Sequence, residues 1–140
     1  MTAADRPTVD PSSETAEFLD GLARGELLLP HCIACGRVGH PGERRCVRCM
    51  AKSFEWIAAS GRATVFSYTT IDRSFHPAFE TPYAVTAFEL EEGPRLIGEL
   101  VGVPPESIEV GLDVVVDRVA PALGDAPLRF HPAEMSIRQP

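Results

Sequence analysis

Four cysteines constrain this chain more than any other feature. They form the pattern Cys-x-x-Cys twice, first with Cys32 and Cys35 and then with Cys46 and Cys49. Ten residues separate the two pairs, and the chain has no other cysteine. Two such pairs, each on a tight turn, can direct four thiolates at one point, as a closed tetrahedral zinc site requires. The spacing therefore predicts a structural zinc ribbon, but it does not reveal what the protein does.

A disulfide framework is the main alternative use of these cysteines, and it is typical of small secreted chains that begin with a signal peptide. Residues 1–15 are polar and acidic and include Pro7 and Pro11, so they do not resemble a signal peptide. No uncharged run approaches the roughly 20 residues of a membrane span. We therefore expect a cytoplasmic, reducing setting that favours a bound metal. Iron in the same sulfur cage and a redox dithiol are the remaining alternatives.

The predicted metal site offers little chemistry of its own. A catalytic zinc keeps one position open for water or substrate, whereas four thiolates close the site. His31 and His40 lie beside the cysteines and either could replace one, but four cysteines already suffice. No cysteine is left over to act as a nucleophile. We therefore do not expect this chain to be a catalyst by itself.

A short helix is expected before the ribbon, with Ser12 or Ser13 as its cap and Gly25 as its stop. One apolar stripe runs along this helix and consists of Phe18, Leu19 and Leu22. The stripe either packs on the rest of the chain or forms an exposed arm that docks on a partner subunit. A helix this short is marginal unless it packs on something.

A pattern of period two begins at Phe54 and predicts a β-rich second half. We expect the first strand to run from Phe54 to Ile71 with a bend at Gly61, and one helical turn at Pro104–Ser107. The later strands are expected at residues 82–90, 95–101, 112–120 and 128–130. Five short antiparallel strands with this small helix between the third and the fourth indicate an OB-type barrel.

The predicted fold class is therefore mainly β, with a short N-terminal helix, a rubredoxin-like four-cysteine ribbon and a five-stranded OB-type barrel. At 140 residues the chain has about the length of one domain. The expected divisions are a disordered tail at 1–12, the helix and a lead-in strand at 13–30, the ribbon at 31–53, the barrel at 54–132 and a C-terminal tail at 133–140.

The order of these parts resembles a known family over about residues 13–132. The pieces that carry the resemblance are Gly25-x-Leu27, the four cysteines, Trp56, Gly61, Ser67-Tyr68-Thr69, Pro82-Tyr83, Leu90-Glu91-Glu92-Gly93 and Gly111. The family is that of bacterial and archaeal zinc-ribbon plus OB-fold proteins that accompany thiolases and lipid-transfer-protein-like aldolases. One departure lies in the two Cys-x-x-Cys turns, here called knuckles. The first knuckle ends in Cys35-Gly36, whereas the second ends in Cys49-Met50.

The resemblance implies a non-catalytic accessory subunit that binds a thiolase-fold acyltransferase or aldolase. It also implies that the subunit helps to bind or position an acyl-CoA thioester, such as a steroid side-chain or other lipid CoA ester. The alternatives are a module that binds single-stranded nucleic acid and a rubredoxin-like electron carrier. A net charge of -7 argues against nucleic acid as a partner, since phosphate contacts dominate such binding.

Two groups of residues are candidates for contact with the CoA ester. The ribbon arginines Arg37, Arg44, Arg45 and Arg48 could bind the CoA phosphates, or they could simply offset the negative charge of a four-thiolate zinc centre. The loop after Ile71 adds Arg73, Phe75, His76 and Phe79. This loop either caps the barrel end or contributes to the acyl-CoA channel or the partner interface. A general acid or base role for His76 is a further alternative.

Overall fold

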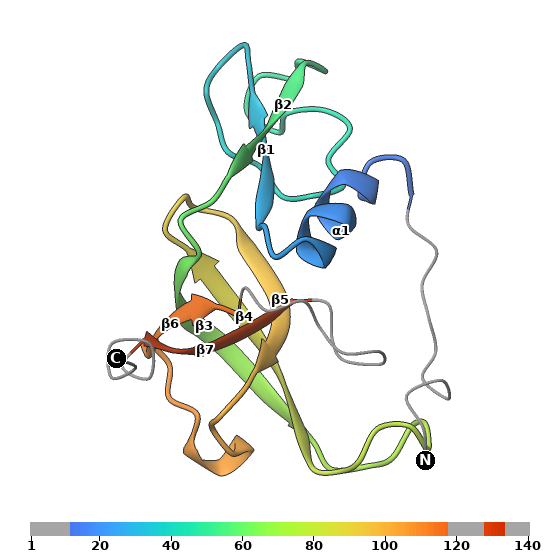
Figure 1. Ribbon diagram of the computed structural model, residues 1–140, viewed down its shortest axis with the longest axis vertical. Helices are drawn as coiled ribbons and strands as arrows, with labels where there is room; N and C mark the ends of the chain where they lie inside the picture. Colours follow the sequence, from blue (N-terminus) through green and yellow to red (C-terminus); the bar gives the residue numbers. More distant parts are fainter. Residues whose placement is uncertain (1–11, 118–127, 134–140) are drawn as a thin grey trace.

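A computed structural model describes residues 12–117 and 128–133 of the chain (Figure 1). The elements in chain order are α1 (Ala16–Ala23), β1 (Leu28–Cys32), β2 (Phe54–Ala58), β3 (Arg62–Ile71), β4 (Tyr83–Leu90), β5 (Arg95–Leu100), the 3-10 turn η2 (Pro105–Ser107), β6 (Asp113–Val116) and β7 (Arg129–Pro132). Residues 1–11 and 134–140 of the predicted tails, and residues 118–120 of the strand expected at 112–120, lie outside the described residues. Among the described helices, none is long and apolar enough to cross a membrane.

Helix α1 ends at the predicted glycine but begins later than predicted. Gly25 has a φ of 80°, and its N–H donates to the Leu22 carbonyl at 3.0 Å. The next N–H, that of Glu26, donates to the Gly21 carbonyl at 2.8 Å, which completes a Schellman motif. The N-cap is Thr15 and not Ser12 or Ser13, because residues 12–15 form a separate turn in which Ala16 N–H donates to the Ser12 carbonyl.

The apolar stripe of α1 packs on the chain's own core. Leu22 is buried, and Phe18 and Leu19 are partly buried against the same hydrophobic cluster. The stripe therefore packs within the chain and does not form a free arm, while a contact of the partly buried Phe18 and Leu19 with a partner subunit stays a prediction. The helix gains stability because its apolar side chains leave water at the junction with β1.

Five strands close into the barrel in the order β3-β4-β5-β7-β6, which confirms the predicted fold class. The pair β5–β7 is parallel and the other neighbouring pairs are antiparallel. The expectation of a wholly antiparallel barrel was wrong for a topological reason. In a closed ring with an odd number of strands, direction cannot alternate all the way round, so one neighbouring pair must be parallel.

The strand expected to run from Phe54 through Gly61 is in fact two strands. β2 pairs with β1, from Leu28↔Ala58 to Cys32↔Phe54, and takes no part in the barrel. Gly61, with a φ of 88°, lies in the turn between β2 and β3. The irregularity within the first barrel strand is instead a register shift between Val65 and Ser67 in β3. The β1–β2 ladder therefore belongs to the ribbon and connects it to the barrel.

The barrel core contains one stacked aromatic pair among mostly aliphatic side chains. Phe88 and Phe130 are both 0% exposed, and their ring centroids lie 4.2 Å apart. Burial of each ring contributes about 2–3 kcal/mol relative to an exposed position. Leu27 and Leu29, at the base of the ribbon, belong to the same hydrophobic cluster. One core therefore holds the barrel and the base of the ribbon together.

Thr86 is the one buried polar side chain in the described part of this core, and its hydroxyl has no hydrogen-bond partner. Replacing it by valine removes the unpaired hydroxyl at nearly constant shape. We expect Thr86→Val to raise the free energy of unfolding by about 1 kcal/mol. Urea denaturation measures this change, with the exposed Thr69→Val as the matched control. A loss of stability would show that the hydroxyl is satisfied in solution.

Candidate functional site

The two cysteine turns share one backbone design. In the first, the Gly36 N–H donates to the Cys32 carbonyl and the Cys32 N–H donates to the Arg37 carbonyl, both at 2.8 Å. In the second, the Met50 N–H donates to the Cys46 carbonyl and the Cys46 N–H donates to the Ala51 carbonyl, again at 2.8 Å. Repetition of this turn brings the two cysteine pairs face to face at the free end of the ribbon.

The four sulfurs converge as a metal cluster requires. Their Sγ atoms all lie within 4.8 Å of one another, and no disulfide joins them. The Cys32–Cys49 and Cys35–Cys46 sulfur pairs are each 3.6 Å apart. Four sulfurs bound tetrahedrally at about 2.3 Å from one ion lie about 3.8 Å apart, so the geometry suits a single ion such as zinc. The site has four soft donors and can hold a metal ion.

The thiols differ in how readily they ionise. A backbone hydrogen bond from Cys49 lowers the pKa of Cys46 to about 6, and one from Cys35 lowers the pKa of Cys32. For Cys49, a backbone hydrogen bond from Ala51 lowers the pKa. Desolvation and the neighbouring thiols raise it by a larger amount, so the pKa of Cys49 is about 11. Four adjacent negative charges repel one another, so a bound cation is what allows all four thiols to ionise together.

Met50 occupies the position that glycine holds in the first knuckle. Its φ is 64°, close to the 82° of Gly36, and no other non-glycine residue in the described part has a positive φ. The left-handed conformation costs an L-residue with a side chain roughly 1–2 kcal/mol. The sequence departure at Cys49-Met50 therefore leaves the turn intact and introduces local strain.

Met50→Gly should relieve this strain. We expect it to raise the free energy of unfolding of the metal-loaded chain by about 0.5–1 kcal/mol, since the greater freedom of glycine in the unfolded state offsets part of the gain. Met50→Ala retains the strain and should leave stability within about 0.5 kcal/mol of the wild type. Thermal unfolding of the three proteins makes the comparison. Equal stability of the glycine and alanine variants would contradict the account.

Loss of one sulfur should affect the ribbon but not the barrel. The segment between β1 and β2 contributes only Val38 to the hydrophobic cluster, and it does so as a partly buried neighbour. We expect Cys46→Ser to reduce the metal content to near zero and to unfold the knuckles while the barrel stays folded. Metal analysis and amide hydrogen exchange measure these two effects. Retained metal together with native exchange in residues 33–53 would show that the cluster is dispensable.

Three of the four candidate ribbon arginines are already engaged within the chain. Arg37 donates to Glu43 at 2.9 Å, and this hydrogen bond raises the pKa of Arg37. Arg44 pairs with Glu14 at 2.9 Å. Arg45 donates to the carbonyl of Met50 at 3.1 Å. These contacts brace the ribbon, which favours the structural role over the phosphate-binding role for these side chains.

The second candidate group forms the tip of the β3–β4 hairpin. Phe75 is 72% exposed, so it does not cap the barrel core. The guanidinium of Arg73 lies 5.9 Å from its ring centroid. Phe79 contacts both His76 and Tyr83, with ring centroids 5.9 and 6.0 Å apart. The tip is therefore an ordered aromatic cluster in which the ring of Phe75 is mostly exposed to solvent.

His76 helps to order this tip. The N–H of Ala78 donates to its Nδ1 at 3.0 Å, and the N–H of Phe79 donates to its carbonyl at 3.1 Å. Nδ1 is thus an acceptor, so the ring proton of neutral His76 sits on Nε2. These contacts explain a histidine at this position without any catalytic role.

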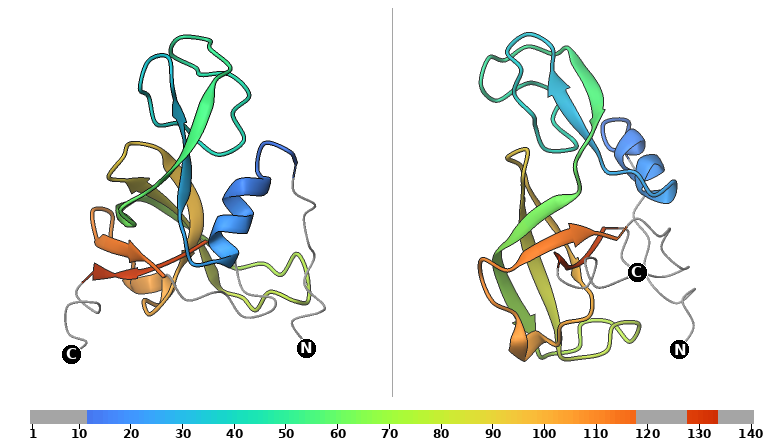
Figure 2. Two further views of the ribbon diagram at one scale, coloured as in Figure 1. Left: turned by 45° about the horizontal axis from the view of Figure 1, so that its top comes forward. Right: turned by 60° about the vertical axis from the view of Figure 1, so that its left-hand side comes forward.

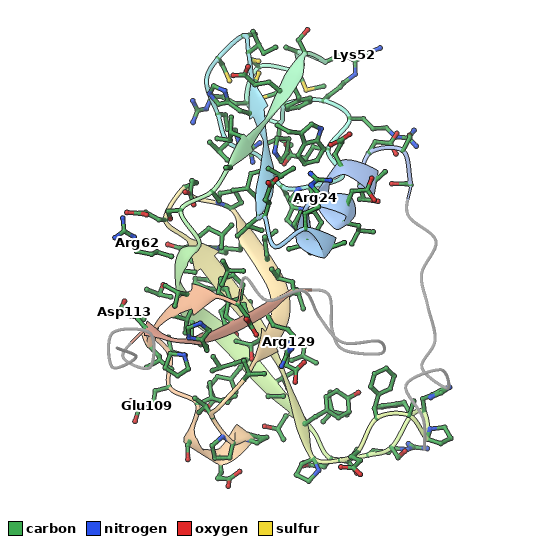
Figure 3. All side chains as sticks on the ribbon, viewed as in Figure 1. Arg24, Lys52, Arg62, Glu109, Asp113 and Arg129 are labelled. Carbon is green, nitrogen blue, oxygen red and sulfur yellow. The ribbon has the colours of Figure 1, made fainter. Side chains whose placement is uncertain are left out.

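The two candidate groups do not form one pocket. The ribbon lies at one end of the long axis, and the β3–β4 hairpin projects from the other end of the barrel (Figures 1 and 2). A shallow depression between them, on the barrel wall, is lined by Arg62, Glu91 and Asp113 among others (Figure 3). In the described part of the chain, the ribbon arginines and the hairpin tip are therefore separate surfaces.

Sequence reasoning missed one surface beside the metal cluster. Ile33 and Val47 are 60% and 67% exposed, and Met50 is 58% exposed. Ile33 and Val47 each follow the first cysteine of a pair, where the knuckle turns outward. Apolar residues at these turn positions were a usable signal, because turns at a surface usually carry polar side chains.

The fold and the cluster define the class: a four-cysteine ribbon followed by a closed five-stranded OB barrel. The family described as "ChsH2, C-terminal OB-fold domain" matches residues 56–118. A solved structure titled "Ltp2-ChsH2(DUF35) aldolase" contains a chain that is 34% identical, with a TM-score of 0.77 over 91% of this chain and 99% of that one. This chain belongs to the same family, the DUF35 proteins with a ChsH2-type OB fold, which confirms the resemblance seen in the sequence.

Several named proteins are similar to this chain. A "Probable enoyl-CoA hydratase alpha subunit" of Thermomonospora curvata is 36% identical over 80% of this chain and 35% of its own length. The "3-oxo-4,17-pregnadiene-20-carboxyl-CoA hydratase alpha subunit" of Mycobacterium tuberculosis is 33% identical over 74% of this chain and 33% of its own length. This chain therefore spans about a third of either hydratase subunit. A "DUF35 domain-containing scaffold protein" of Methanocaldococcus jannaschii is 34% identical, over 59% of this chain and 60% of its own length.

Proposed function

We propose that this chain is a non-catalytic accessory subunit that binds a thiolase-fold acyltransferase or aldolase and helps to position an acyl-CoA thioester. The observation that carries the proposal is the match, over nearly the full length of both chains, to a subunit of a structure titled as an aldolase. The relatives named as scaffold proteins support the assembly role. The hydratase relative named for a CoA ester supports the class of substrate.

The chemistry of the chain agrees with an accessory role. All four cysteines belong to the sulfur cluster, so none is available as a nucleophile for acyl transfer. We assign zinc to this cluster as a structural ion, since a four-thiolate site leaves no position for substrate. In this proposal the partner supplies the reacting groups, and this chain supplies binding surface.

The hairpin tip is the stronger of the two candidate contacts with the CoA ester. Arg73 offers a cation for a phosphate, and Phe75 offers an exposed ring for stacking or for an apolar pocket. The ribbon arginines are the weaker candidates because Arg37, Arg44 and Arg45 have partners within the chain. The same contacts weaken the nucleic-acid alternative, which needs free cations along its binding face.

Two linked measurements test the proposal. Affinity purification of the tagged chain from its native host should recover a thiolase-fold protein in a fixed ratio. In the assembled complex, Arg73→Ala combined with Phe75→Ala should weaken acyl-CoA affinity about ten-fold, since it removes one charged and one aromatic contact. Arg44→Ala combined with Arg45→Ala is the matched control and should change affinity less than three-fold, or roughly 0.6 kcal/mol.

Recovery of no thiolase-fold protein would reject the proposed function. A larger loss of affinity in the Arg44–Arg45 control than in the hairpin variant would move the CoA contact to the ribbon.

A further inference from the structure

The free end of the ribbon presents apolar side chains to solvent. Ile33, Val47 and Met50, here called the knuckle patch, are all more than half exposed. Each of them adjoins a cysteine of the sulfur cluster, and the four sulfurs lie within 4.8 Å of one another. The knuckle patch is therefore carried on one small unit that a bound metal makes rigid. A rigid apolar surface loses little conformational entropy on binding.

The backbone at Met50 indicates that this side chain has a use outside the chain. Glycine would relax the turn, as Gly36 does in the first knuckle, whereas Met50 holds a φ of 64°. Packing within the chain does not offset this strain, because the side chain is 58% exposed. Residues held in strained backbone regions such as this one cluster at active sites, ligand clamps and switch segments.

The charges around the knuckle patch indicate the character of its partner. The ribbon carries five cationic side chains and one acidic one, although the whole chain has a net charge of -7. Arg48 and Lys52 are exposed, and neither forms an ion pair with any residue that the structure describes. Isoleucine, valine and methionine suit an apolar protein pocket, whereas single-stranded nucleic acid binds aromatic stacking platforms. The complementary surface is thus an apolar pocket with an acidic rim.

We propose that the knuckle patch inserts into an apolar, acid-rimmed pocket on the thiolase-fold partner, with Arg48 and Lys52 facing the acidic rim. This inference rests on the proposed function and adds the surface through which the two subunits dock. Figure 3 shows the side-chain sulfurs, in yellow, at the end of the molecule marked by Lys52, away from the end marked by Glu109. The patch residues adjoin the cysteines at that end. The barrel and its hairpin then remain free for other contacts.

Met50→Gly separates docking from folding, because it should stabilise the turn while it removes part of the docking surface. We expect about a ten-fold loss of affinity for the thiolase-fold subunit recovered with the wild-type chain, measured by titration calorimetry. Met50→Leu retains the apolar bulk and should bind within about three-fold of the wild type. Arg48→Glu combined with Lys52→Glu should lower the association rate and reduce its dependence on salt.

A cross-linking pair locates the contact directly. Val47 and Val110 are both 67% exposed, but Val110 lies beside Glu109 at the far end of the barrel. A photoreactive side chain at position 47 should cross-link to the thiolase-fold subunit, and the same group at position 110 should not.

The docking surface would be overturned if Met50→Gly bound the partner as tightly as the wild type does. Cross-linking from position 110 but not from position 47 would overturn it as well. In either case the recovered complex would still support the proposed function. If the wild-type chain recovers no thiolase-fold subunit, both are rejected. If the wild-type chain retains single-stranded DNA and the Arg48–Lys52 variant does not, the knuckle patch binds nucleic acid and the protein-docking proposal is rejected.

Discussion

Convergence of four sulfurs is the constraint on which the ribbon depends. Between Pro30 and Trp56, the hydrophobic cluster gains only partial contact from Val38. Segments with so little buried apolar surface do not fold by the hydrophobic effect alone. The four sulfurs can hold a metal ion, which would supply the missing free energy only when both knuckles are in place. The cluster is thus the feature on which a defined surface of the ribbon depends.

The ribbon also needs a fixed position in the molecule, and the barrel supplies it. Leu27 and Leu29 belong to the same core as Phe88 and Phe130. The β1–β2 ladder then continues from this shared core to the cysteines. Because the ribbon and the hairpin tip lie at opposite ends, the molecule presents two separate surfaces on one scaffold (Figure 2). That arrangement suits a subunit that contacts more than one site in an assembly.

Much of this architecture could be predicted because its signals are local. The cysteine spacing predicted the cluster, and Gly25 predicted the helix end. The strand pattern and the small helical turn predicted an OB barrel. Pairing between distant segments was harder, since period two in Phe54–Ala58 fits a ribbon strand as well as a barrel strand. The parallel β5–β7 pair follows from closure of the barrel and not from any residue in either strand.

The candidate site was predictable in its chemistry but not in its layout. Residue types singled out the cysteines, and the structure brings their four sulfurs together, whereas the arginines and the aromatic loop stay predictions as binding residues. Sequence could not show that Arg37, Arg44 and Arg45 find partners within the chain, because those contacts depend on the folded ribbon. Nor could it show that the helix stripe faces inward, since an amphipathic helix can bury its stripe on its own chain or on another.

The central claim is that the metal holds a docking surface and takes no part in the chemistry. Substitution of the native ion by Co²⁺ tests this most directly, because the visible spectrum of Co²⁺ reports its coordination number and its thiolate ligands. We expect the bands of a tetrahedral four-thiolate site, and we expect them to stay unchanged when the thiolase-fold subunit and an acyl-CoA thioester are added. A shift to the weaker bands of a five-coordinate ion on addition of the thioester would contradict the account.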